Sequence, residues 1–71
     1  MDTSATASYL RGLINNGVTF LAEVRTTDES HYAKLVVYDA DDLGIRAAAA
    51  GYDFLIIPWT VIDSVLIDIT N

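Results

Sequence analysis

The C-terminal part of the chain, residues 53–69, contains two apolar segments of β-strand length, and neither includes Lys or Arg. A tight turn at Pro58-Trp59-Thr60 separates them. Both faces of each segment are apolar, and a chain of 71 residues can bury only one of those faces in its own core. Edge strands are normally protected by charge, Pro or bulges, so a long apolar edge indicates a partner strand. The sequence therefore predicts a small β-barrel subunit that assembles with copies of itself.

Length and composition point to the same need for a partner. One domain of this size buries roughly 60% of the surface of its unfolded chain, and such domains are usually reinforced by disulfides, a metal or oligomerisation. The chain has no Cys and one His, His31, so disulfides and thiolate metal sites are excluded. We expect neither a metal nor a cofactor. The hydrophobic fraction of 52% indicates that something outside the subunit covers part of its surface.

The same features favour a cytoplasmic protein without a membrane partner. The longest nearly apolar run, Phe54 to Ile62, is too short to span a bilayer. The start of the chain, Met1-Asp2-Thr3-Ser4, lacks the basic and apolar stretches of a secretory signal. The absence of Cys is consistent with a reducing compartment.

The charge balance disfavours nucleic acid as a partner. The net charge is −6, and the only cations are Arg11, Arg25, Lys34 and Arg46. Affinity for nucleic acid depends heavily on contacts from Lys and Arg to phosphate. These cations could form a phosphate-binding face if the fold gathered them, but pairing with the ten carboxylates is the favoured interpretation.

Hydrophobic periodicity predicts a helix over residues 5–15, with Thr3 or Ser4 as its N-cap. Its apolar stripe comprises Tyr9, Leu10, Leu13 and Ile14, and Asn15-Asn16-Gly17 is a stop signal. Five strands are expected at residues 18–26, 32–38, 43–50, 53–58 and 64–69.

One of these strands has a competing interpretation. Ala47–Ala50 has high helix propensity, and Gly51 could end a helix there. Residues 43–50 are too few for an independent helix, however, and their alternate positions are apolar, so we favour a strand. A helix followed by five short antiparallel strands predicts a mainly β fold in one domain, a small closed or half-closed barrel.

This order of elements resembles the Sm-like (LSm) family, including its Hfq branch, over nearly the whole chain, and the resemblance implies a five-stranded antiparallel barrel of the SH3 type. Val37-Tyr38-Asp39-Ala40-Asp41, followed by Leu43 and Ile45, fits the family's first motif. The run from Ile57 to Val65 matches the apolar positions of its second motif without gaps. Such hydrophobicity patterns indicate a fold better than a function.

The resemblance implies a ring in which the strand at 53–58 of one subunit pairs with the strand at 64–69 of the next. These are the two segments that the residue pattern had already marked as unprotected. The ring would contain about five to seven copies, as in the family, closed by a heterologous interface. The expected interface residues are Phe54, Leu55, Ile56, Ile57, Ser64, Val65, Leu66 and Ile67.

The chain departs from the family at the positions that bind RNA. Ile45 replaces the Asn that holds a uracil, and Pro58-Trp59 replaces an Arg-Gly pair. The Lys-His pair of the Hfq branch falls on Trp59-Thr60, and the basic end of its helix corresponds to the uncharged Ile14-Asn15-Asn16-Gly17. Leu35 also stands where the second strand usually has Gly. The uridine pocket and the cationic rim are therefore not expected here.

The positions that remain as candidates for RNA contact are Asp42, Leu43, Trp59, Thr60 and Arg46. Trp59 could stack on a base, because aromatic faces bind bases without charge. Tryptophan is also enriched at protein interfaces, and packing between subunits is the favoured interpretation of Trp59.

The carboxylates of Asp39, Asp41 and Asp42 could hold Mg²⁺ or Ca²⁺ through oxygen ligands. The loop lacks the Gly and Glu of an EF-hand, and Asp favours turns, so a solvated hairpin turn is the favoured interpretation.

Catalysis has little support in the sequence. Ser30 and His31 are adjacent, and neighbours in a strand or turn point apart. Asp28 and Glu29 are loop carboxylates with no sign of burial that would shift a pKa. We expect no catalytic residue and no enzyme.

Two functional hypotheses follow. The resemblance implies a ring that binds or chaperones RNA. Charge and the missing pocket favour an acidic scaffold or adaptor ring that binds proteins and no RNA.

Overall fold

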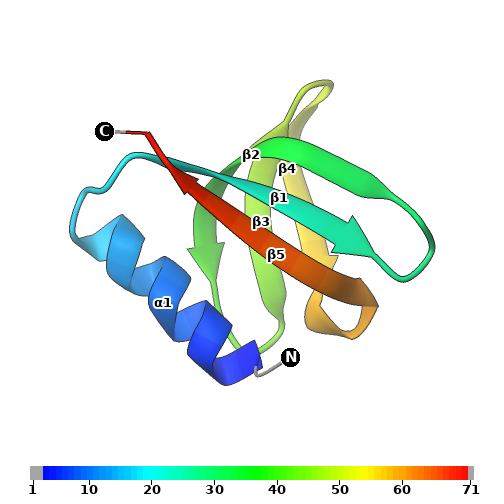
Figure 1. The fold of residues 1–71 in the computed structure, drawn as a ribbon, viewed down its shortest axis with the longest axis horizontal. Helices are drawn as coiled ribbons and strands as arrows, with labels where there is room; N and C mark the ends of the chain where they lie inside the picture. Colours follow the sequence, from blue (N-terminus) through cyan, green and yellow to red (C-terminus); the bar gives the residue numbers. More distant parts are fainter. Residues whose placement is uncertain (1–2, 71) are drawn as a thin grey trace.

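The computed structural model describes residues 3–70 and shows one α-helix followed by a five-stranded antiparallel sheet (Figure 1). In chain order the elements are α1 (Thr3–Asn15), β1 (Phe20–Thr26), β2 (His31–Ala40), β3 (Gly44–Ala49), β4 (Tyr52–Pro58), the 3₁₀ turn η1 (Trp59–Val61) and β5 (Ile62–Ile69). The mainly β class is confirmed. The expected elements are present, and each of their ends lies within two residues of expectation.

The helix α1 ends as expected and starts earlier than expected. At its C-terminus the N–H of Val18 donates to the C=O of Leu13 at 3.0 Å, and Gly17, with φ 68°, donates to Ile14 at 3.1 Å. This left-handed stop is the Schellman motif. The predicted cap was wrong, because α1 begins at Thr3 and the residue before it lies outside the described range.

One face of α1 packs on the sheet. Ala7 and Leu10 are buried, and Leu13 and Ile14 pack against the core. Tyr9 was predicted to belong to this apolar face, but it is 52% exposed and lies outside it. No helix among residues 3–70 is long and apolar enough to cross a membrane.

The segment 44–49 is a strand, which confirms the favoured interpretation. β3 pairs with β2 on one side and with β4 on the other. Ile45 and Ala47 are fully buried in the core. Two flanking strands satisfy the backbone groups of β3, so tertiary pairing overrides the helix propensity of its alanines.

The sheet has the strand order β4-β3-β2-β1-β5, so β4 and β5 are its two edges. β2 joins the halves of the sheet, pairing first with β1 and then with β3. Its register shifts once against each neighbour, and Lys34 at the first shift has φ 58°. Bulges of this kind bend a strand and increase its twist. Figure 1 shows the result, with β1 and β5 crossing in front of β3 and β4.

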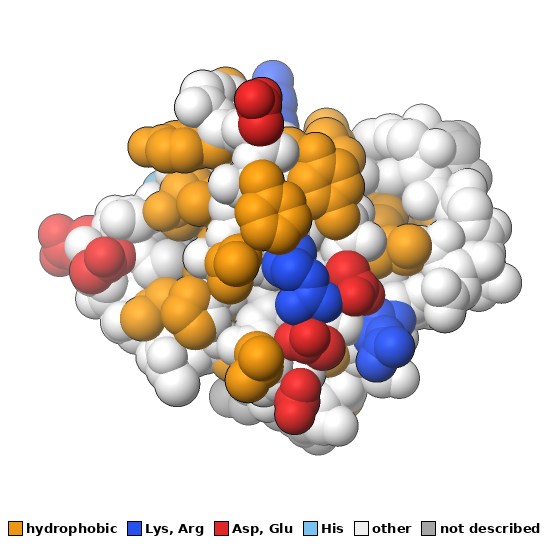
Figure 2. Space-filling model, turned by 180° about the vertical axis from the view of Figure 1, so that it is seen from behind, with side chains coloured by type: hydrophobic (Ala, Val, Ile, Leu, Met, Phe, Trp, Pro, Cys, Tyr) orange, Lys and Arg blue, Asp and Glu red, His pale blue; other side chains and the backbone are white. Residues whose placement is uncertain are grey.

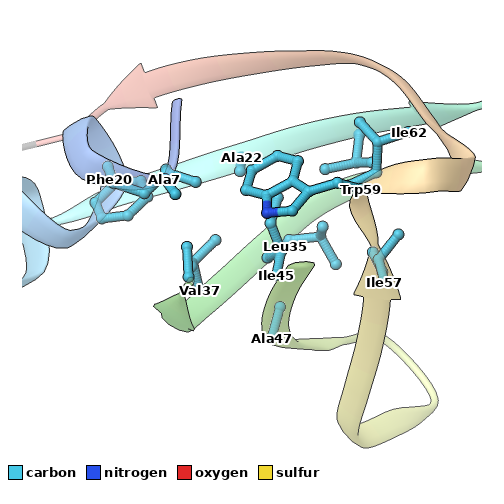
Figure 3. Close-up of a cluster of buried hydrophobic side chains, with 13 residues drawn as sticks. Ala7, Phe20, Ala22, Leu35, Val37, Ile45, Ala47, Ile57, Trp59 and Ile62 are labelled. Carbon is cyan, nitrogen blue, oxygen red and sulfur yellow. The ribbon is translucent and has the colours of Figure 1, made fainter. Parts of the chain in front are cut away.

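The core lies between the two halves of the bent sheet and under α1. Leu10, Val24, Leu35 and Ile45 are its largest fully buried side chains. Figure 3 shows side chains of β1, β2 and β3 converging there, with Trp59 and Ile62 at one side. Leu35, which stands where the resemblance expects Gly, fills the core, and the bend falls on the adjacent Lys34.

Candidate functional site: a loop cluster and two free strand edges

The loop between β2 and β3 and the turn η1 are joined by hydrogen bonds. The indole Nε1–H of Trp59 donates to the C=O of Asp41 at 2.5 Å, and its backbone N–H donates to the C=O of Leu43 at 3.2 Å. We call the group formed by Asp41, Asp42, Leu43, Trp59 and Thr60 the loop cluster. It brings together four of the five residues predicted to contact RNA.

The fifth candidate, Arg46, is held by carboxylates beside the loop cluster. Its Nη2 lies 2.7 Å from Asp39 Oδ2, and its Nη1 lies 2.9 Å from Asp41 Oδ2. These bonds, Asp39 first, raise the pKa of the Arg46 guanidinium. In turn, the Arg46 guanidinium is the main cause that lowers the pKa of Asp39. Two carboxylates therefore bind the Arg46 guanidinium, which leaves it poorly suited to phosphate.

Asp41 organises its own turn. Its Oδ1 accepts hydrogen bonds from the N–H of Leu43 at 2.9 Å and of Gly44 at 3.3 Å. The bond from Leu43 is the largest cause that lowers the pKa of Asp41, followed by the bond from Arg46. Within residues 3–70 no group of three or more His, Cys, Asp or Glu is placed to hold a metal ion. The carboxylate of Asp41 stabilises its own turn through these hydrogen bonds, in agreement with the favoured interpretation of a hairpin turn.

Trp59 lies in the hydrophobic core of the chain. Its side chain is only 7% exposed and packs among Leu35, Ala22 and Ile62 (Figure 3). Both earlier interpretations, a base-stacking platform and a subunit contact, need an accessible indole, so this position corrects them. The physical reason is that the indole packs within the buried apolar cluster, and the Asp41 carbonyl accepts the hydrogen bond of its N–H.

The exposed part of the loop cluster carries no cation. Leu43 is 73% exposed, and Asp42 and Thr60 are also exposed. Beside them a groove of about 610 Å³ runs between α1 and the β2–β3 loop, and its lining includes Arg11, Asp41 and Asp42. Acidic groups therefore outnumber basic groups around this part of the surface.

The arginines lie in ion pairs, as the favoured interpretation expected. Arg11 Nε lies 3.9 Å from Asp39 Oδ1, and Arg25 Nη2 lies 3.6 Å from Glu23 Oε1. Arg46 is paired as described above. Arg11 and Arg46 therefore meet at Asp39, whereas Arg25 pairs separately with Glu23, and each of the three guanidinium groups faces a carboxylate.

The residues considered for catalysis belong to a turn and a strand surface. His31 Nε2 lies 3.1 Å from Glu23 Oε1, on the neighbouring strand β1. Asp28 accepts a hydrogen bond from the hydroxyl of Thr26 and one from the N–H of Ser30 at 3.1 Å. The bond from Thr26 is the largest cause that lowers the pKa of Asp28. These contacts close the β1–β2 turn.

Gly44 holds the loop cluster against β4, and the sequence analysis missed it. A Cβ at this position would lie 2.2 Å from the carbonyl oxygen of Ile57 and 2.8 Å from the Cα of Pro58. Only Gly allows the two backbones to approach so closely. Its place directly after a turn and before a strand was the available signal, because Gly in a strand often marks such an approach.

The second candidate surface is formed by the two edge strands. Phe54, Ile56 and Leu66 are more than half exposed, and Leu55, Val65, Ile67 and Ser64 are half-buried. Ile57, expected at the interface, is 3% exposed and belongs to the core, because its side chain points to the opposite face from Ile56. Within residues 3–70, no pairing joins β4 to β5. Both edges are apolar and lack a neighbouring strand.

Further apolar side chains lie next to the β4 edge. The rings of Tyr38 and Phe54 stack with centroids 6.2 Å apart, and both side chains are about half exposed. Val36 on β2 and Tyr52 on β4 are also at least half exposed. Figure 2 shows hydrophobic side chains gathered on this side of the molecule beside a group of acidic and basic ones.

Comparison of the chain with protein-family models, with curated proteins and with solved structures gave no match. The functional argument therefore depends on the geometry of the loop cluster and of the two edges.

Proposed function

We propose that this chain is an Sm-like subunit of a closed homo-oligomeric ring that acts as an acidic scaffold for other proteins in the cytoplasm, without catalysis. The observation that carries the proposal is the strand order, which leaves the apolar strands β4 and β5 at the two edges of one sheet. These are the strands through which the resemblance expects subunits to pair.

The two edges support a ring in particular. They are different surfaces of the same chain, so a contact between β4 of one copy and β5 of the next is heterologous. A heterologous contact closes into a ring when its rotation is suitable. A ring would satisfy every sheet edge, and the resemblance suggests about five to seven copies.

Charge supports a protein partner over RNA. Each subunit has a net charge of −6, and its arginines are bound to carboxylates. A ring multiplies this negative charge, which repels a polyanion. The buried position of Trp59 also removes the aromatic platform that could have bound bases without charge.

The exposed apolar side chains offer a surface for a protein. Val36 and Tyr38 on β2 and Tyr52 on β4 are about half exposed, and Leu43 projects from the loop cluster. Aromatic residues are enriched at protein interfaces, and charged residues are depleted from their centres. A scaffold that binds proteins can use these apolar side chains, and it does not need the free Lys and Arg side chains that RNA binding requires.

RNA binding is the second candidate function, and one observation favours it. The hydrogen bond between Trp59 and Leu43 brings Asp42, Leu43 and Thr60 together at the loops where the resemblance places RNA contacts. A gel shift with U-rich and A-rich RNA at low salt separates the two roles, because electrostatic affinity is greatest there. We expect no shift, and a salt-dependent shift that Leu43→Ala weakens would replace the scaffold by the RNA-binding ring.

Assembly itself is tested by native mass spectrometry and light scattering at micromolar concentration. We expect the unmodified chain to be an oligomer and Ile56→Lys to be a single subunit, because a charge then lies on the apolar edge of β4. Val36→Lys is the matched control, since Val36 is 50% exposed but lies on the internal strand β2. A single subunit for the unmodified chain, or equal loss of assembly in both variants, would contradict the proposal.

A further inference from the structure

One face of the strands β2, β3 and β4 is apolar and exposed. Val37 of β2 and its partner Ala47 of β3 are buried in the core. The next pair, Val36 and Ala48, therefore lies on the opposite side of the sheet, which we call the outer face. Figure 2 shows hydrophobic side chains gathered there. The outer-face patch consists of large apolar side chains that are 49–62% exposed, those of Val36, Tyr38, Phe54 and Ile56.

The two aromatic rings of the outer-face patch are fixed by contacts within the chain. The rings of Tyr38 and Phe54 are stacked, with centroids 6.2 Å apart and planes 10° apart. β3 lies between their strands, so the two rings meet over β3, where the small side chain of Ala48 leaves room for them. The Tyr38 hydroxyl also donates a hydrogen bond to the C=O of Asp53 at 3.2 Å. Side chains that are already ordered lose less conformational entropy when a ligand binds.

Carboxylates outnumber cations at the border of the outer-face patch. Asp53 precedes Phe54 in β4 and is exposed, and Asp42 is exposed in the β2–β3 loop. Within residues 3–70 no ion pair reaches either of these two carboxylates. Lys34 lies on the other half of the sheet, in a depression that Glu23 also lines. The border therefore has four carboxylates and two guanidinium groups, those of Asp39, Asp41, Asp42 and Asp53 with Arg11 and Arg46.

The outer-face patch has the width of one α-helix. It extends over three neighbouring strands, which gives two strand spacings of about 4.8 Å each. An α-helix with its side chains is about 10–12 Å in diameter. The helix α1 packs on the core side through Ala7 and Leu10, so it leaves the outer face uncovered. An apolar sheet face is normally buried against another element of secondary structure.

We infer that the outer-face patch binds an amphipathic α-helix of another protein, a helix with one apolar stripe and with Lys or Arg beside that stripe. This binding rests on the proposed scaffold role and specifies the kind of protein that the scaffold holds. The apolar stripe covers the rings of Tyr38 and Phe54 and removes them from water, which is favourable. The basic side chains reach the carboxylates at the border, where Asp42 and Asp53 have no cation of their own chain.

Charge favours another protein over a second copy of this chain. Two outer faces in contact would bring two acidic borders together, and each copy has a net charge of −6. The chain's own helix also lacks the required chemistry, because Arg11 is its single basic residue. The proposed ring leaves room for such a partner, since a strand added at an edge extends the sheet in its own plane and leaves the outer face accessible.

Two synthetic peptides test the chemistry of the partner. The first is a fluorescent helical peptide of about five turns, with a stripe of Leu and with Lys beside it. The second has Glu in place of every Lys. Fluorescence anisotropy should show that the Lys peptide binds the unmodified protein, and that added salt weakens this binding because the charges attract across exposed surface. The Glu peptide should not bind, because its charge repels the acidic border.

Three variants test the position of the binding site. Phe54→Ala and Val36→Lys should each weaken binding of the Lys peptide about tenfold or more, because both change the outer-face patch itself. Tyr9→Lys is the matched control, since Tyr9 is 52% exposed on α1 and the same charge is added away from the outer face. It should change the affinity by less than about twofold. Circular dichroism confirms the fold of each variant, and Phe54→Ala replaces Val36→Lys where the latter does not fold.

The outcomes separate this partner from the proposed ring. No binding of the Lys peptide, equal binding of both peptides, or equal losses in Tyr9→Lys and Val36→Lys would overturn the basic helix and leave the ring. A halved oligomer mass in Val36→Lys would assign the outer face to a second copy. Binding of phosphatidylcholine vesicles or of A-rich RNA that Phe54→Ala abolishes would assign it to lipid or to RNA, and each of these results also overturns the basic helix. If the unmodified chain is a single subunit and still binds the Lys peptide at the patch, the ring alone is wrong.

Discussion

The loop cluster and the two sheet edges belong to the same small sheet, yet they differ in whether their hydrogen-bonding groups already have partners within the chain. In the loop cluster, Asp41 accepts hydrogen bonds from Leu43, Gly44, Arg46 and Trp59. At the edges, β4 and β5 each have a neighbouring strand on one side only, and apolar side chains are exposed on them. The hydrogen bonds of the cluster are made within the chain, whereas each edge has one side without a strand.

This difference indicates which region is structural and which is functional. A polar group whose hydrogen bonds are already made has little to offer a ligand. An apolar edge strand with free backbone groups is a template for another strand. Of the positions that the resemblance marks for RNA, Trp59 is buried and Arg46 is bound to carboxylates, whereas Asp42, Leu43 and Thr60 remain exposed. The proposed assembly depends on the edges instead.

The largest expected effect distinguishes two adjacent residues of β4. Ile57→Ala leaves a cavity in the core and should lower the free energy of unfolding by about 2–5 kcal/mol. Ile56→Ala should change the stability of an isolated subunit by no more than about 0.5 kcal/mol, because Ile56 is exposed. Urea unfolding measures both.

The same pair also reports on assembly. In the unmodified chain the unfolding midpoint should rise with protein concentration, and in Ile56→Ala this dependence should weaken. If both variants lose the same stability, and the loss does not depend on protein concentration, the edge of β4 is not an interface.

The next effect concerns the backbone approach that closes the loop cluster. Gly44→Ala should lower the free energy of unfolding by about 3 kcal/mol, because its Cβ would overlap the Ile57 carbonyl. Gly12→Ala in α1 is the matched control, with no atom within 4 Å of the added Cβ. It should raise stability by about 0.5–1 kcal/mol. If thermal unfolding shows that both substitutions change stability in the same direction, the close approach of the two backbones does not require Gly at position 44.

A smaller effect of opposite sign, a gain in stability, is expected at the bend in β2. Lys34 has φ 58°, a left-handed conformation that is unfavourable for a residue with a Cβ. Lys34→Gly should stabilise the chain by about 1 kcal/mol in urea unfolding. Lys34→Ala removes the same charge and keeps the Cβ, so a matching gain there would assign the effect to charge and not to backbone strain.

The smallest effect is the response of the loop cluster to acid. Hydrogen bonds from Arg46 to Asp39, and from Leu43 and Arg46 to Asp41, hold the pKa of each carboxyl below its ordinary value of 3.8. The unfolded chain then binds protons more readily than the folded chain. The stability these groups contribute is present above pH 3.8 and is lost as the pH falls through their lowered pKa values.

The matched comparison is Arg46→Gln, which should lose less stability than the unmodified chain between neutral and acid pH. The effect is modest because the carboxylates are exposed and screened by solvent. Thermal unfolding at both pH values measures it, and an unchanged acid response would show that Arg46 does not stabilise these carboxylates.

The alternation of apolar residues was enough to predict the elements and their order. It placed Phe20, Ala22 and Val24 on one face of β1, and these residues are buried. It also marked residues 53–58 and 64–69 as apolar and unprotected, because a local pattern reports which faces avoid water. Even the alanine-rich β3 followed this pattern.

Tertiary structure alone decided the roles of Trp59, Arg46 and Gly44. Each depends on a contact with a segment distant in the chain, with Asp41 for Trp59, Asp39 for Arg46 and Ile57 for Gly44. Such contacts follow from the bend of β2 and the order of the strands, and no local pattern contains them. The sequence by itself determined that two apolar strands would lack cover. The fold decided that they lie at opposite ends of one sheet, because the three strands between them satisfy one another's hydrogen bonds.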